Sequence, residues 1–302
     1  HHVELIRDYL LDFCEVVGKT QTEDDDFVTP NLPNFEIAVS TKDFNPPDPL
    51  QLPVLCYCRE IHDPTGNGCI MHPGFGFRFR KIDENIYSSR TDFDQKFPWT
   101  SKQKKLVGRF SAYERAGRYR DNRTRKAFLD FAATQGDTMD VRLNGKIPIR
   151  EFMKEKYILH LDGVAHSFQL EEKLGMNSVV VSEKKKFQTY FTHLLEPGKH
   201  YVDFWEIDDQ PEDIVKVLDW LKANDDLAYN ISKNGQDFAH RYLTKRSRLA
   251  YYRELLSRYA ALLQYEVEKP VSALRVCCPG DHQCNENDLD VQIMGRDSIS
   301  HH

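Results

Sequence analysis

The stretch KYILHLDGVAHSFQLEEKLGMNSVVV, residues 156–181, decides the fold of this chain. Residues 157–161 form a short, largely apolar run, which is typical of a strand buried on both faces. The Asp162-Gly163 pair indicates a turn, because glycine adopts positive φ at no steric cost. Residues 164–174 carry apolar side chains on one helical face, and residues 178–181 are largely apolar and β-branched again. The stretch therefore predicts a strand, a crossover helix and a second, parallel strand.

The turn at Gly163 is the first candidate site. In a parallel sheet such a unit is right-handed, and the turn after its first strand faces the open crevice. A ligand with phosphates commonly binds there, against the N-terminal amides of the helix. The spacing alone leaves two interpretations open, a phosphate site at Gly163 or an ordinary βαβ unit without a ligand.

The composition restricts the class of protein. A chain of 302 residues can form one large or two medium domains. A hydrophobic share of 40% suits a well-packed globule and excludes wholesale disorder. The net charge of −6 argues against nucleic acid as the main partner. No run approaches the roughly 18–20 apolar residues that a membrane span needs, so we expect none.

The cysteines favour disulfide bonds. Six of the seven fall into two short groups, CYC with Cys69 and CCPGDHQC, and loops of this length close readily under oxidising conditions. Free cysteines are the second interpretation. Zinc is the third, because histidines lie nearby but the Cys-x-Cys spacing is short for a zinc site. The glycosylation triplets at Asn122 and Asn230 mildly support a secretory lumen. The seven cysteines are Cys14, Cys56, Cys58, Cys69, Cys277, Cys278 and Cys284.

Strands alternate with helices from about residue 106 to 205, which predicts a doubly wound α/β half. A helix, two strands and loops precede it and indicate a smaller first half. Outside the opening stretch, we expect helices over residues 3–17, 126–133, 184–195, 211–223, 224–242 and 245–265. We expect strands over residues 34–40, 53–58, 106–111 and 139–143, and a loop with a short strand over residues 198–204.

Residues 112–125 are dense in arginine. One interpretation is a solvated face. The other is a clamp for phosphates, because guanidinium groups pair with phosphate in a bidentate manner. The arginines are Arg115, Arg118, Arg120, Arg123 and Arg125.

The quoted stretch resembles the core of the protein O-glucosyltransferase family, glycosyltransferase family 90. In that family a strand ends in Asp-Gly or Arg-Gly, and a small-residue turn, a helix and a Gly-Ser-x-Val strand follow. The segments FPWTSKQKKLVGRFS (residues 97–111) and FTHLLEPGKHYVDF (residues 191–204) are similar to further family segments. The helices after residue 211 look like the family's closing helices. The resemblance covers about residues 95–265, with the segments in the family's order.

This resemblance implies a GT-B fold, an α/β architecture of two Rossmann-like halves with the active site in the cleft between them. Residues 1–105 would form a short acceptor-side half. Residues 106–245 would form the half that binds the nucleotide sugar, and residues 246–302 would add a closing helix and a cysteine-containing tail.

The resemblance also implies an inverting, metal-independent transfer of a sugar, glucose or xylose, from a UDP-sugar to a hydroxyl of a protein or glycan acceptor. No cofactor is expected besides the UDP-sugar donor. The implied location is the lumen of the secretory pathway or outside the cell. The alternative is an inactive relative that binds a sugar nucleotide or glycan, which Gln169 favours because the family has arginine there.

Five residues match donor-binding positions of the family. Arg109 and Ser111 match its Arg-Gly-Ser strand end, and Gly163 and Ser167 match the turn and the helix start. Arg125 matches the arginine that opens the following helix, although Arg123 or Arg115 could take that place.

The catalytic base of the family is an acidic residue between an aromatic loop and a Pro-Trp pair. Asp83 is the first candidate here, with Glu84 beside it and Asp92 and Asp94 as alternatives. Its role would be to remove the proton of the acceptor hydroxyl.

Overall fold

The computed structural model describes residues 35–40, 54–61, 69–74, 81–87, 90–111, 125–143, 147–163, 165–205 and 211–266. The predicted helix over residues 3–17, the arginine run before Arg125 and the second cysteine group lie outside these residues.

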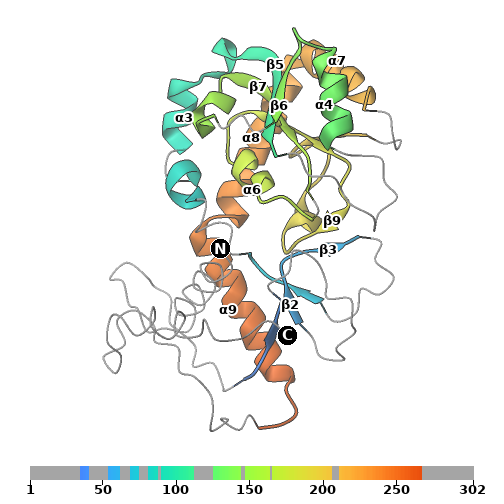
Figure 1. The fold of residues 1–302 in the computed structure, drawn as a ribbon. Coiled ribbons are helices and arrows are strands. Elements are labelled where there is room, and N and C mark those ends of the chain that lie inside the picture. The colour runs from blue at the N-terminus through green and yellow to red at the C-terminus, as the bar shows by residue number, and fades with distance from the viewer. Residues whose placement is uncertain are drawn as a thin grey trace, which may run out of the picture.

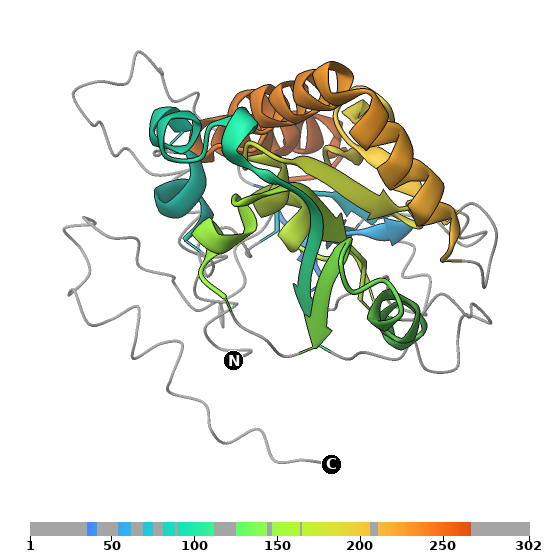
Figure 2. The same cartoon turned by 90° about the horizontal axis from the view of Figure 1, so that it is seen from above.

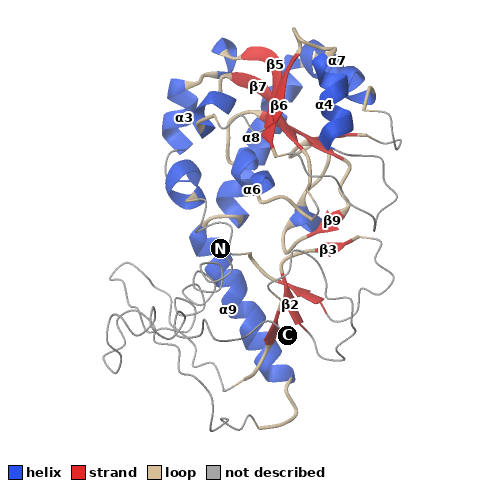
Figure 3. Cartoon of the chain, viewed as in Figure 1, coloured by secondary structure: helices blue, strands red, loops and turns tan. Residues whose placement is uncertain are grey.

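A five-stranded parallel sheet forms the larger half (Figures 1 and 3). Its order is β10-β8-β7-β5-β6. The first strand, β5, lies between β6 and β7, so the strand order reverses between β5 and β7 and creates a topological switch point. The strands are β5 (Gln103–Phe110), β6 (Met139–Leu143), β7 (Glu155–His160), β8 (Val179–Glu183) and β10 (Val202–Phe204).

Helices cover both faces of this sheet (Figure 2). Because side chains alternate along a strand, Tyr157 and Leu159 pack against α4 and α7, while Ile158 packs on the opposite face with α6 and α8. Burial on both faces explains why residues 157–159 of β7 and 179–181 of β8 are continuously apolar in sequence. The helices are α4 (Arg125–Ala133), α5 (Ile149–Phe152), α6 (Gln169–Leu174), α7 (Asp213–Ala223) and α8 (Asp225–Tyr242).

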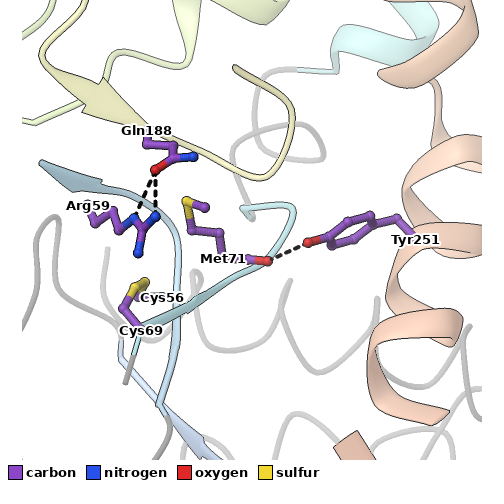
Figure 4. The surroundings of a disulfide bond; sticks show 6 residues. All are labelled: Cys56, Arg59, Cys69, Met71, Gln188 and Tyr251. Carbon is purple, nitrogen blue, oxygen red and sulfur yellow. Dashed lines mark hydrogen bonds between the residues drawn. A yellow bond between two sulfur atoms is a disulfide. The ribbon is translucent and has the colours of Figure 1, made fainter. Parts of the chain in front are cut away.

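A three-stranded parallel sheet of order β1-β2-β4 belongs to the first half. The disulfide Cys56–Cys69 joins two of its strands, with a Cα–Cα distance of 5.7 Å (Figure 4). Disulfide bonding is thus confirmed for this pair, whereas Cys58 is buried and lies outside this bond. The strands are β1 (Ala38–Val39), β2 (Val54–Cys56) and β4 (Cys69–Met71).

The two halves are connected at two places outside the candidate site. Strand β3 (Arg59–Glu60) pairs antiparallel with β9 (Phe187–Gln188), and Arg59 donates two hydrogen bonds to the Gln188 amide oxygen (Figure 4). Helix α9 (Lys245–Leu262) follows α8 and runs back along the first half (Figure 1). The Tyr251 hydroxyl of α9 donates to the Met71 carbonyl at 2.9 Å.

Short helical segments lie between the halves in the sequence. They are the π-helical turn η1 (Asp83–Tyr87), α3 (Arg90–Lys96) and the 3-10 helix η2 (Trp99–Ser101). A further 3-10 helix, η3 (Thr192–Leu194), follows β9.

Among the described residues, no helix is both long enough and apolar enough to cross a lipid bilayer.

The α/β class with parallel sheets is confirmed, but two predicted helices need correction. The helix predicted over residues 184–195 is wrong, because this segment contains β9 and η3. The pairing of β9 with β3 and the burial of Phe187 override the local helical pattern. The helix predicted over residues 164–174 begins only at Gln169, because hydrogen bonds described below hold the preceding residues in a turn.

Candidate functional site

The candidate site lies at the carboxyl edge of the larger sheet, between β5 and β7. Parallel α/β sheets bind ligands in the crevice at such a switch point. The segment after β7, residues 161–163 and 165–168, is called the β7 turn here. The Gly163 amide donates to the Ala165 carbonyl at 3.0 Å, which closes the turn.

Arg125 joins the ends of β5 and β7. As the first residue of α4 it donates to the carbonyls of Leu161 and Asp162, each at 3.1 Å, and to the Ser111 carbonyl at 3.0 Å. These bonds hold the Arg125 guanidinium, a positive charge, at the edge of the sheet. The structure therefore brings Arg125 together with the Ser111 backbone and with the turn that contains Gly163, and their role in donor binding stays a prediction.

Arg109 faces the neighbouring strand β6. Its guanidinium bonds the Asp140 carboxylate at 2.6 Å and the Asp140 carbonyl at 2.5 Å. Partial burial raises the pKa of Asp140, but Arg109 and Arg142 outweigh this and hold the pKa below its usual value. Arg109 is thus tied to an acidic partner on β6.

Asp162 organises the β7 turn. Its Oδ1 accepts the Ser167 amide at 2.9 Å and lies 3.4 Å from His160 Nε2 and 3.7 Å from His166 Nδ1. Burial opposes ionisation, yet the two histidines and the Ser167 amide hold the pKa of Asp162 well below its usual range. Its own amide donates to Glu183 at 2.6 Å. The Ser167 amide is therefore engaged within the turn.

The pKa values of the two histidines shift in opposite directions. Burial lowers the pKa of His160 to about 4, so its ring is neutral at pH 7. Burial acts likewise on His166, but Glu171, 3.3 Å away, and Asp162 together raise its pKa. This buried cluster was not predicted from the sequence, although the spacing of His160 and Asp162 places both on one side of an extended chain.

Lys185 adds a second cation at the carboxyl edge, just after β8. Its Nζ lies 4.2 Å from the centre of the Tyr201 ring and has no hydrogen-bond partner within the described part of the chain. Burial lowers its pKa to about 8, against the opposing effect of Asp162 and Asp203. Lys185 lies in the segment that was predicted as a helix, so its place at the sheet edge was not predicted. The signal in the sequence is a run of lysines directly after a buried strand.

Gln169 opens α6, and its side-chain oxygen accepts from Lys173 Nζ at 2.9 Å. Lys173 is buried and also donates to the Leu159 carbonyl at 2.7 Å. A lysine one turn later thus carries positive charge on the helix where the resembled family has its arginine.

Asp83 lies in η1 and pairs with Arg248 of α9 at 2.7 Å. The same carboxylate accepts the Lys245 amide at 2.8 Å. Asp83 therefore stabilises the start of α9. Its role as a base stays a prediction. The alternatives Asp92 and Asp94 are exposed and pair with Lys96 and Lys233.

Comparison with known proteins gives the family. The model of glycosyl transferase family 90 matches residues 35–301. O-glucosyltransferase rumi of Drosophila melanogaster is 35% identical over 132 residues, 44% of this chain and 32% of that protein. The rumi homolog of Aedes aegypti is 25% identical over 275 residues, 82% of this chain and 66% of that protein. Protein O-glucosyltransferase 2 of Danio rerio is 30% identical over 169 residues, 54% of this chain and 33% of that protein.

Among solved structures, Anabaena Alr3699/HepE in complex with UDP and glucose is 14% identical with a TM-score of 0.41, covering 58% of this chain and 54% of that one. TarM is 13% identical with a TM-score of 0.40, covering 67% and 49%. The matched part spans about a third of the fly and fish relatives, 32% and 33%. Since the family model covers most of the sequence, the chain belongs to glycosyl transferase family 90.

Proposed function

We propose that this chain binds a UDP-sugar at the switch point and transfers the sugar, with inversion, to a hydroxyl of a protein or glycan acceptor. The observation that carries the proposal is a pair of cations at the carboxyl edge beside the β7 turn of a family 90 chain: Arg125, which is buried, and Lys185, whose Nζ is buried. Negative charge develops on the leaving diphosphate as the glycosidic bond breaks. Fixed cations in a water-poor site stabilise this charge without a metal ion.

Inversion requires attack on the face of the sugar opposite UDP. The acceptor hydroxyl must lose its proton during this attack, and a carboxylate is a suitable base. We propose Asp83 for this role, with Asp92 or Asp94 as alternatives. The names of the relatives support glucose as the sugar and a protein as the acceptor, and xylose remains the second donor to test.

We also propose an oxidising location, the lumen of the secretory pathway or the cell exterior. The disulfide Cys56–Cys69 supports it, because such bonds persist mainly in oxidising compartments. Asn230, in a glycosylation triplet, is exposed on α8 and so can carry a glycan.

A second candidate is a family member that binds a sugar nucleotide without turnover. Gln169 favours it, because its neutral side chain stands where the resembled family has arginine. Lys173 and Lys185 favour the enzyme, because they supply positive charge on the same helix and at the same sheet edge.

Two measurements on the full chain separate these functions. Calorimetry reports UDP binding, and an assay that detects free UDP reports the UDP released from UDP-glucose, UDP-xylose or UDP-galactose. Binding with slow release from one donor supports the enzyme, and binding with no release from any donor supports the second candidate. Absence of binding contradicts both, and Arg125→Ala should abolish the binding.

A further inference from the structure

Tyr57 reaches from the first half to the β7 turn. It follows β2 directly, and its side chain is buried, with 4% of the residue exposed. Its hydroxyl donates to the carbonyl of His166. Its ring stacks on Phe168, with centroids 4.3 Å and planes 15° apart. A residue of the first half thus contacts the turn through a hydrogen bond and a stacked ring.

The hydrogen bond fixes a particular peptide unit. The His166 carbonyl and the Ser167 amide belong to one planar trans peptide, and its C=O and N–H therefore point in opposite directions. The Tyr57 hydroxyl donates a hydrogen bond to this oxygen, and the Asp162 carboxylate accepts one from the N–H at 2.9 Å. Rotation of this peptide would break both bonds, so its orientation is set jointly by the two halves.

Gly74 supports the stacked rings from the first half. A Cβ added at Gly74 would lie 2.5 Å from Phe168 Cζ and 3.0 Å from Tyr57 Cδ2. Any side chain here must therefore displace the stack. Ala165 and Phe187 pack with the same buried group.

We propose that Tyr57 is a positioning residue, which, with Gly74 and Phe168, holds the β7 turn in the conformation that receives the donor diphosphate. This proposal rests on the proposed function. The turn precedes a helix of only six residues, Gln169–Leu174, so little regular structure fixes it from its own half. A binding loop must be held by surrounding contacts to be preorganised, and here the hydrogen bond and the stacked ring of Tyr57 add contacts from the opposite half.

The first test compares two tyrosine variants of the full chain. Tyr57→Phe removes the hydroxyl and keeps the ring. Tyr251→Phe is the matched control, because its hydroxyl also donates to a backbone carbonyl across the halves, that of Met71. We expect Tyr57→Phe to weaken UDP affinity by about threefold to tenfold, the size of one lost hydrogen bond, and Tyr251→Phe to leave it unchanged. The donor KM should rise more than kcat falls.

The second test uses glycine variants. Gly74→Ala should weaken UDP binding through the displaced stack. Gly136→Ala is its control, because a Cβ there meets no atom within 4 Å. Hydrogen exchange should rise at the amide of Ser167 in Tyr57→Phe and Gly74→Ala and stay unchanged in both controls.

The outcomes separate the two proposals. Failure of the unchanged chain to bind UDP overturns the proposed function. Hydrogen exchange at the Ser167 amide still reports whether Tyr57 stabilises the β7 turn. UDP binding by the unchanged chain with equal affinity and equal exchange in Tyr57→Phe and Tyr251→Phe overturns the role of Tyr57 alone.

Discussion

Lys185 is a buried ammonium group without a hydrogen-bond partner among the described residues, and burial of such a charge costs free energy. We therefore expect Lys185→Met to leave the melting temperature unchanged or to raise it, while UDP affinity falls by about tenfold because a cation at the diphosphate is lost. Calorimetry and thermal melts measure the two effects. Exposed Lys184 provides the control, Lys184→Met. A variant that melts lower and binds UDP normally would contradict a role in binding.

Substitution of Asp83 tests whether its carboxylate acts as the base or only stabilises the structure. Its pair with Arg248 is mostly buried, with 29% and 8% of the side chains exposed. Asp83→Asn should therefore lower the free energy of unfolding by about 1–3 kcal/mol in urea titrations. Asp92→Asn removes an exposed pair and should change it by less than about 1 kcal/mol.

The transfer rate of the same variant tests the base. If Asp83 removes the acceptor proton, Asp83→Asn lowers UDP release from UDP-glucose by about 100-fold or more per folded molecule and leaves UDP affinity intact. Unchanged release would transfer the proposed role to Asp92 or Asp94.

At the scale of elements, the buried strands could be predicted from sequence, because their apolar runs are local. The strand predicted over residues 139–143 agrees with β6 at both ends. The helix predicted over residues 184–195 failed, because β9 is held by β3, more than 120 residues away. In the candidate site, too, local features could be predicted from the sequence and contacts between distant segments could not. Gly163 and Arg125 could be predicted from motifs, whereas the approach of Tyr57 depends on a contact over 109 residues.

The disulfide between β2 and β4 closes a loop with a sequence separation of 13. Closing a loop of this size removes chain entropy from the unfolded state, an effect of about 3 kcal/mol. The double variant Cys56→Ala/Cys69→Ala should lose this amount in urea titrations. Cys58→Ala changes a buried cysteine outside this bond and controls for lost packing. Equal losses in both would contradict a stabilising disulfide.

At the scale of the whole molecule, the halves contact each other through β3 and β9, through Tyr57 at the β7 turn, and through α9. Helix α9 belongs to the second half in sequence but holds the first half through Tyr251 and Tyr252. The candidate site lies beside these contacts, so its geometry depends on how the halves dock. Sequence patterns predicted the α/β class and a smaller first half, but local periodicity carries no information on this docking.

Two buried histidines, one in each half, should make the whole fold sensitive to acid. Burial lowers the pKa of both His72 and His160 to about 4, from 6.5 in the unfolded chain. Between about pH 4 and 6.5 the unfolded state binds more protons, so stability must rise with pH across this window. His166 acts oppositely, because its raised pKa gives a contribution that is lost as pH rises above 6.5.

Thermal melts from pH 4.5 to 8 test this prediction. We expect the melting temperature to fall steeply below about pH 6.5, where both neutral histidines must take up protons on unfolding. His160→Gln should flatten this slope, because an amide of similar size does not titrate, while His193→Gln, whose residue is exposed, should leave it unchanged. If the melting temperature depends on pH equally in the unchanged chain, His160→Gln and His193→Gln, then His160 does not stay neutral in the folded state.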